Sequence, residues 1–152
     1  MRTTSTPKKI RPRRRVFVQR AVPGAPAASL LRGYALAAAR PGCEVTLRVV
    51  GAAEARRLNS NYRGKRRATN VLSFQYQEKP LKGDVVLCHP VIAREARAQR
   101  KTLAAHYAHL VVHGMLHLRG HDHLRKRDAA RMERSEIRIL RRLGFADPYE
   151  DK

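Results

Sequence analysis

The sequence has few cysteines, few aromatic residues and no long apolar segment, and each shortage excludes a class of protein. Two cysteines in 152 residues cannot form the disulfide framework of a small secreted domain, and no CxxC pair is present. We therefore expect a reducing, cytoplasmic setting. No apolar run approaches the ~20 residues that a membrane-spanning helix needs. Aromatic residues make up only 5% of the chain, so stacking of nucleic-acid bases is expected to be limited.

Acidic residues are also scarce, and the chain is strongly basic as a result. There are 33 Lys and Arg against 12 Asp and Glu, which gives a formal net charge of +21. A field of this sign concentrates polyanions at the surface, so nucleic acid or an anionic membrane is the expected class of partner. The charge argues against small neutral or cationic metabolites as main ligands. It leaves open whether the protein only binds its partner or changes it.

Length and apolar content indicate one domain. A chain of 152 residues is too short for two ordinary domains, and 43% hydrophobic residues suffice for one core. We predict a basic flexible arm at 1–12, a single domain at 13–147 and a short tail at 148–152. Alternating apolar residues predict four strands, at 15–19, 44–50, 70–76 and 84–88. Helices are predicted at 26–40, 52–62, 90–100 and 102–119, so the chain favours an α+β fold with a small sheet.

Six of the seven histidines lie between residues 106 and 123. If 102–119 is a helix, its turn of about 100° per residue gathers apolar side chains on one side that can face the core. These are Leu103, Tyr107, Leu110, Val111, Gly114 and Leu118. Four histidines then lie within about 80° of one another on the flank of that side, namely His106, His109, His113 and His117.

The segment HGMLHLRGHDH predicts a metal site on this helix and in the turn after it. His113 and His117 are one helical turn apart, so both rings can reach the same ion. Gly120 supplies the left-handed residue that commonly ends a helix, and His123 follows it. Three imidazole ligands leave a fourth position for water, which is typical of a catalytic zinc. The histidines at 106 and 109 are interpreted instead as solvated or hydrogen-bonded helix residues.

The same spacing occurs in zinc proteases with the motif HExxHxxGxxH. Those enzymes place a glutamate directly after the first histidine, where it acts as the general base. Here that residue is Gly114, which has no group that can transfer a proton. The sequence therefore keeps the metal ligands but disfavours peptide hydrolysis.

The motif resembles the signature of the YbeY family, the bacterial rRNA-maturation endoribonucleases. Three further segments resemble family segments in the same order: LNSNYR at 58–63, TNVLSF at 69–74 and GDVVL at 83–87. The resemblance covers about residues 44–145. It implies a compact α+β domain with a mixed four-stranded sheet packed on helices and the metal site on a central helix.

The resemblance also implies an activity. It is that of a zinc-dependent, single-strand-specific endoribonuclease acting in 16S rRNA 3′-end maturation and ribosome quality control, with one Zn²⁺ on His113, His117 and His123. Arg63 maps onto an arginine tied to activity, and an arginine near a metal ion can clamp a phosphodiester with two N–H groups. Whether water or the RNA 2′-OH is the nucleophile stays open. The alternative is a non-enzymatic ribosome-assembly factor with a structural metal.

Two basic runs predict an RNA-binding groove beside the metal. Residues 55–77 hold six basic and no acidic residues, and those expected to bind RNA are Arg56, Arg57, Lys65, Arg66 and Arg67. Residues 125–142 hold eight basic and three acidic residues. This second run has an alternative interpretation as an exposed helix face, on which Asp128, Glu133 and Glu136 offset part of the charge. Met132, Ile139, Leu140 and Leu143 would then form its buried side.

The expected partners are rRNA and the small ribosomal subunit, with no membrane and no DNA. If counterion release holds the RNA, activity falls steeply as salt rises from ~50 to ~200 mM.

Overall fold

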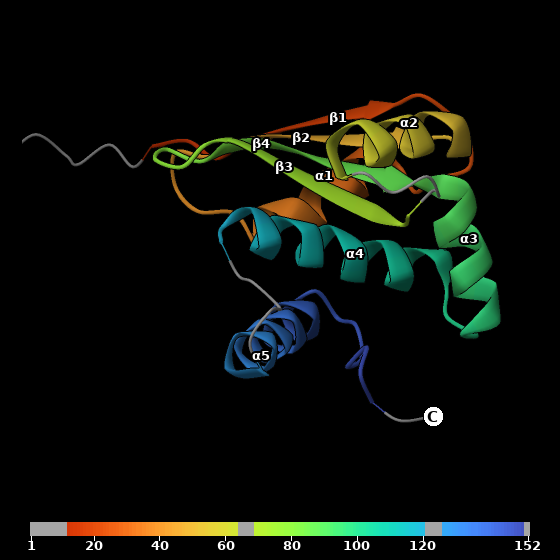
Figure 1. Cartoon of the computed structure of the whole chain (residues 1–152). Helices are drawn as coiled ribbons and strands as arrows, with labels where there is room; N and C mark the ends of the chain where they lie inside the picture. Colours follow the sequence, from red (N-terminus) through yellow and green to blue (C-terminus); the bar gives the residue numbers. More distant parts are fainter. Residues whose placement is uncertain (1–11, 64–68, 121–125, 151–152) are drawn as a thin grey trace, which may run out of the picture.

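A four-stranded mixed sheet forms the centre of the fold, in the order β1-β2-β4-β3 (Figure 1). The computed structural model describes residues 12–63, 69–120 and 126–150. The strands are β1 (Arg15–Arg20), β2 (Glu44–Val50), β3 (Val71–Gln77) and β4 (Lys82–Cys88). β1, β2 and β4 are parallel, and β3 runs antiparallel to β4. The predicted α+β class and the four predicted strands are confirmed, with bounds that shift by at most two residues.

Helices cover both faces of this sheet. They are α1 (Ala28–Ala37), α2 (Ala52–Arg63), α3 (His89–Ala98), α4 (Leu103–Leu118) and α5 (Lys126–Arg142). Figure 1 shows α2 over one face and α4 along the other, with α5 beyond α4 on the side away from the sheet. Helix α4 contacts β3, β4, α1, α3 and α5, so it is the central helix of the domain. Within the described ranges, no helix combines the length and apolar character needed to cross a membrane.

The pleat of β4 divides the core into two parts. Val85 and Leu87 pack with the residues of α1 and α4, whereas Val86 and Cys88 pack with Ala55 of α2 on the other face. Successive side chains of a strand point to opposite faces of a sheet, which produces this division. The larger part lies under α4, so the histidine-bearing helix is held by the main core.

Gly114 is the point where α4 comes closest to the sheet. A Cβ atom at this position would lie 2.7 Å from Val85 Cγ1, and Ser73 Oγ donates a hydrogen bond to the Gly114 carbonyl oxygen at 3.0 Å. The side of α4 that carries residue 114 therefore faces the strands. A protease-type glutamate here would collide with the sheet, which adds a steric reason to the chemical one for excluding that mechanism.

Candidate functional site

Helix α4 lines up four histidine rings along one flank. Thr102 Oγ1 caps the helix by accepting from Ala105 N at 3.0 Å, and Gly120 follows its last turn with φ +90°. Neighbouring ring centroids along the row His106, His109, His113 and His117 are 6.3, 6.2 and 6.3 Å apart. The predicted apolar side of the helix is buried or packed on the core. The helical arrangement predicted for the histidines is thus confirmed, including the left-handed glycine after it.

A buried carboxylate from α5 meets two of these rings. Glu136 Oε1 accepts from His113 Nδ1 at 2.5 Å, and Glu136 Oε2 accepts from His109 Nε2 at 3.2 Å. The hydroxyl of Tyr149 also donates to Glu136 Oε2. The Glu136 side chain has no solvent-exposed surface. We call Glu136, His109, His113 and Tyr149 the Glu136 cluster.

Hydrogen bonds keep Glu136 ionised in this buried place. Burial alone raises the pKa of a carboxyl group, because it disfavours the charged form. The hydrogen bonds from His109, His113 and Tyr149 outweigh burial and lower the pKa of Glu136 to about 2. Burial and the adjacent carboxylate raise the pKa of Tyr149, so its hydroxyl stays a donor. Glu136 therefore carries its negative charge beside the histidine row at neutral pH.

Among the described residues, His109, His113 and Glu136 offer ligand atoms within 4.8 Å of one another and could hold a metal ion. In the present geometry, however, His113 and Glu136 are hydrogen-bonded to each other. Two donors of one tetrahedral zinc, each about 2.0–2.2 Å from the ion, lie about 3.3 Å apart. The 2.5 Å between His113 Nδ1 and Glu136 Oε1 is shorter than that separation. This contact fits a Glu136 that orients His113 as a metal ligand better than a Glu136 that binds the same metal ion as His113.

The donor set of this region suits a divalent metal ion. A neutral His113 that donates its Nδ1–H carries its lone pair on Nε2, the nitrogen that can then bind a metal. His117 lies one turn further along α4 and is partly buried. His123, the third predicted ligand, lies outside the described residues, as do His121 and Asp122. The predicted ligand set of His113, His117 and His123 thus stays a prediction, to which the structure adds a carboxylate behind His113.

The predicted RNA-binding residues lie on or after α2. Arg63 is the last residue of α2, and its side chain lies outside the described part, as do Lys65, Arg66 and Arg67. Arg56 and Arg57 are exposed on the same helix. Their role in binding stays a prediction.

A second glutamate–histidine contact lies at the N-terminal part of α4. Glu95 Oε1 of α3 accepts from His106 Nε2 at 2.9 Å and from Asn70 Nδ2 at 3.1 Å. His106 is buried, whereas the Glu95 side chain is 32% exposed. Both His106 and His109 are hydrogen-bonded, as interpreted from the sequence, although His109 also belongs to the group that could hold a metal ion. We call Glu95, His106 and Asn70 the Glu95 cluster.

The alternative interpretation of residues 125–142 as an exposed helix face was wrong in placing Glu136 on that face. Glu136 is fully buried and is the acceptor for three donors, because α5 turns this side toward α4. The sequence contained a signal for this. Glu136 is four residues after Met132 and three and four before Ile139 and Leu140, which places it in the middle of the apolar stripe of α5. Tyr149 carried no such signal, since it lies in the segment predicted as a tail.

Comparisons with known proteins agree with the resemblance of the motifs. A family model described as Endoribonuclease YbeY matches residues 28–144. The Endoribonuclease YbeY of Aromatoleum aromaticum is 57% identical over 125 residues, which are 82% of this chain and 81% of the relative. That of Bordetella avium is 51% identical over 127 residues, covering 77% and 79%.

A solved structure shares the fold. The solution structure of TM1509 from Thermotoga maritima matches with a TM-score of 0.57 at 22% identity, over 90% of this chain and 99% of that chain.

The range 28–144 matched by the family model includes the histidine motif up to His123 and also Glu136. The chain therefore belongs to the YbeY endoribonuclease family.

Proposed function

We propose that the protein is a metal-dependent endoribonuclease that cuts single-stranded rRNA precursors in the cytoplasm. Its role would be 16S rRNA 3′-end maturation and ribosome quality control, with rRNA and the small ribosomal subunit as partners. The proposal is supported by relatives named Endoribonuclease YbeY at 51–57% identity over most of the chain. The net charge of +21 suits a polyanionic substrate.

The single observation that carries the metal part of the proposal is the hydrogen bond from His113 Nδ1 to the buried Glu136. A carboxylate behind a ligand histidine fixes the ring orientation and makes the opposite nitrogen more basic. We propose one Zn²⁺ held by His113, His117 and His123, with Glu136 as the orienting group. When bound, such an ion supplies Lewis-acid chemistry at a phosphate and a strong nucleophile at neutral pH.

The remaining steps belong to protein side chains. Glu136 stays ionised and holds His113 in one tautomer, while His109 and Tyr149 hold Glu136. Arg63, at the end of α2, is proposed to clamp the phosphate and to stabilise the charge that develops on it. Exposed Arg56 and Arg57 would attract the RNA backbone along the same helix.

The direct test is cleavage of a 16S precursor RNA by zinc-loaded protein. His113→Ala and His117→Ala should each lower the cleavage rate by at least about 100-fold, because each removes a proposed ligand. His89→Gln is the matched control, since His89 hydrogen-bonds Tyr107 and is not a proposed ligand. Cleavage at the wild-type rate in both alanine variants would contradict the metal mechanism.

The assembly-factor alternative needs a variant that keeps metal and fold. Arg63→Ala is suited to this, because Arg63 ends a helix and is not a proposed ligand. We expect normal zinc content and circular dichroism together with defective rRNA processing in cells. Normal processing in cells that carry only this variant would favour the non-enzymatic factor.

A further inference from the structure

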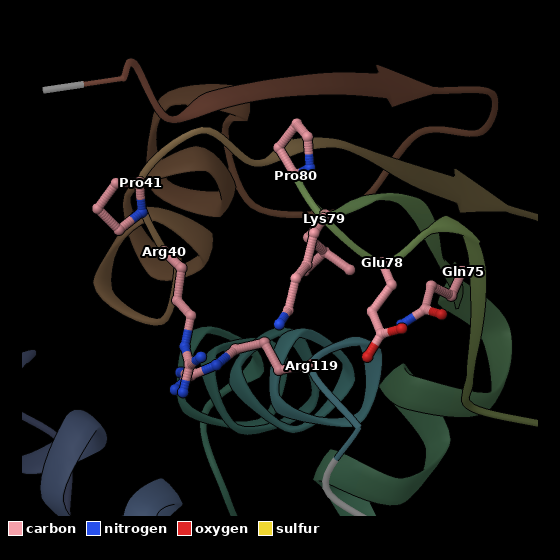
Figure 2. Close-up of a pocket in the computed structure, with 8 residues that line it drawn as sticks. Arg40, Pro41, Gln75, Glu78, Lys79, Pro80 and Arg119 are labelled. Carbon is pink, nitrogen blue, oxygen red and sulfur yellow. The ribbon is translucent and has the colours of Figure 1, made fainter.

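A cavity with three cationic side chains lies at the C-terminal end of α4. It is bounded by the loop between α1 and β2, the turn between β3 and β4, and the C-terminal end of α4, and its volume is about 210 Å³. Arg40, Lys79 and Arg119 line it, with Glu78 as the one acidic residue. In Figure 2, the charged ends of Arg40, Lys79 and Arg119 converge on one space, while the Glu78 carboxylate lies on the Gln75 side. We call this cavity the Arg119 pocket.

The cations of the Arg119 pocket lack anionic partners within the described part of the chain. The ion pairs found there within 4.0 Å involve other residues, and none uses Arg40, Lys79 or Arg119. Arg119 donates through one terminal nitrogen to the Ala38 carbonyl oxygen at 3.3 Å, and its Nε atom is buried without a partner among the described residues. A guanidinium group has five N–H donors, so most of the donor capacity of Arg119 is left for a ligand.

Neighbouring like charges make this arrangement unfavourable without an anion. The ends of Arg40 and Arg119 meet in the view of Figure 2, and burial together with the positive charge of Arg40 lowers the pKa of Arg119. Two such groups repel each other, and an anion between them turns that repulsion into two attractive contacts. The negative end of the α4 dipole explains why Arg119 is favoured at this position, and Gln75 Nε2 already donates to the Leu118 carbonyl oxygen there at 2.9 Å. The additional cations Arg40 and Lys79 are not needed for capping.

We propose that the Arg119 pocket binds a backbone phosphate of the single-stranded RNA that the protein cuts. The proposal rests on the proposed function, because it places a second contact on the same substrate. Arg119 comes two residues after His117 and six after His113 on one helix axis, a rise of about 9 Å from His113. At about 100° per residue, Arg119 also lies about 120° from His113 around that axis, so an RNA strand that contacts both must pass around the C-terminal end of α4. A tetrahedral phosphate accepts hydrogen bonds from several directions, which suits two guanidinium forks and an ammonium group better than a planar carboxylate does.

The test is binding of a labelled, 2′-O-methylated single-stranded RNA of about 12 nucleotides to the zinc-loaded protein, measured by fluorescence anisotropy from ~50 to ~200 mM salt. Arg119→Gln and Arg40→Gln should each weaken binding about 5- to 10-fold. They should also reduce the slope of log affinity against log salt by about 0.7, the value for one lost phosphate contact on a single strand. Arg20→Gln removes one exposed charge at the end of β1 and serves as the matched control.

Arg40 is exposed, so its variant keeps the test valid if Arg119→Gln folds poorly. Equal affinities and salt slopes for Arg40→Gln and Arg20→Gln would overturn the inference. The same variant is tested for binding an oligoglutamate peptide. If Arg40→Gln weakens binding of the peptide but not of the RNA, the inference is also overturned and the pocket is a protein-docking site. Cleavage of 16S precursor RNA is assayed separately with the same preparations. If the wild-type protein cleaves this RNA but both pocket variants bind RNA as tightly as the wild type, phosphate binding in the pocket is refuted. The proposed function is then unaffected.

Discussion

The Glu136 cluster and the Glu95 cluster use the same chemistry on the same helix and differ in depth. In each, a glutamate from a neighbouring helix accepts hydrogen bonds from a histidine of α4. Glu136 is fully buried and serves two histidines and a tyrosine, whereas the Glu95 side chain is 32% exposed and serves one histidine and one asparagine. Water can replace a lost hydrogen-bond partner of an exposed carboxylate, but it cannot reach a fully buried one.

This difference assigns the two clusters different tasks. A fully buried charge is costly unless every lone pair is used, so the Glu136 cluster has a single favourable arrangement and holds His113 in one orientation. The Glu95 cluster ties α3 and the start of β3 to α4 but leaves its carboxylate in contact with solvent. We therefore expect changes at Glu136 to affect metal binding and changes at Glu95 to affect stability alone.

The largest difference is expected between Glu136→Gln and Glu95→Gln. A glutamine amide has one acceptor oxygen, so at least one donor of the Glu136 cluster loses its partner in a dry site. Zinc affinity should fall about 10- to 100-fold, and the free energy of unfolding by about 3 kcal/mol. Glu95→Gln should leave zinc affinity unchanged and cost about 1 kcal/mol.

These changes are measured by zinc titration against a chromophoric chelator and by urea unfolding of metal-free protein. Equal losses of zinc affinity in the two glutamine variants would contradict the division of tasks between the clusters.

Tyr149→Phe tests the contribution of the C-terminal segment to the Glu136 cluster. The variant removes one of three donors from a buried carboxylate, so the free energy of unfolding should fall by about 1.5 kcal/mol. Tyr76→Phe is the matched control, because the Tyr76 hydroxyl bonds Asp84 at 2.6 Å on a 68% exposed ring. That control should change stability by less than about 0.5 kcal/mol in the same urea experiment. If Tyr76→Phe lowers the free energy of unfolding as much as Tyr149→Phe does, the effect of Tyr149→Phe does not depend on the burial of Glu136.

Asn70→Asp turns the Glu95 cluster into a pair of facing carboxylates. The Asn70 amide nitrogen lies 3.1 and 3.4 Å from the two Glu95 oxygens, so an aspartate there replaces a donor by a like charge. We expect a loss of about 1 kcal/mol at pH 7, moderated by the exposure of Glu95. Repulsion raises the folded-state pKa of the pair above the ordinary carboxyl value of about 4, so the loss should shrink as the pH falls toward about 4 and be absent below it. A loss that is constant from pH 7 to pH 3 in urea unfolding would contradict the repulsion.

The smallest expected effect is the pH dependence due to His106. Burial lowers the pKa of His106 from 6.5, although its hydrogen bond to Glu95 acts in the opposite direction. The unfolded chain therefore takes up this proton at higher pH than the folded protein, and the stability that His106 contributes is lost as the pH falls below about 6.5. Compared with His106→Gln, the wild-type protein should lose stability faster between pH 7 and pH 5 in urea unfolding. Parallel pH profiles for the two proteins would show that His106 does not titrate differently on folding.

Local patterns in the sequence predict the elements and the histidine row. Alternating apolar residues predict the four strands to within two residues, and the period of the helix at 102–119 places its four histidines on one flank. These features depend on the residue spacing along one segment, which the sequence states directly. The family motifs predict His113, His117 and His123 as metal ligands in the same way, and that set stays a prediction.

Contacts between segments decide the rest. Glu136 is 23 residues from its partner His113, and its charge suggested a surface position until the packing of α5 on α4 enclosed it. Arg40, Lys79 and Arg119 come from three separate parts of the chain and form one pocket only because two loops meet the end of α4. Sequence alone thus determined the elements, the basic charge and the histidine row. Only the tertiary structure decided which polar residues are buried beside that row, because burial depends on which helix faces meet.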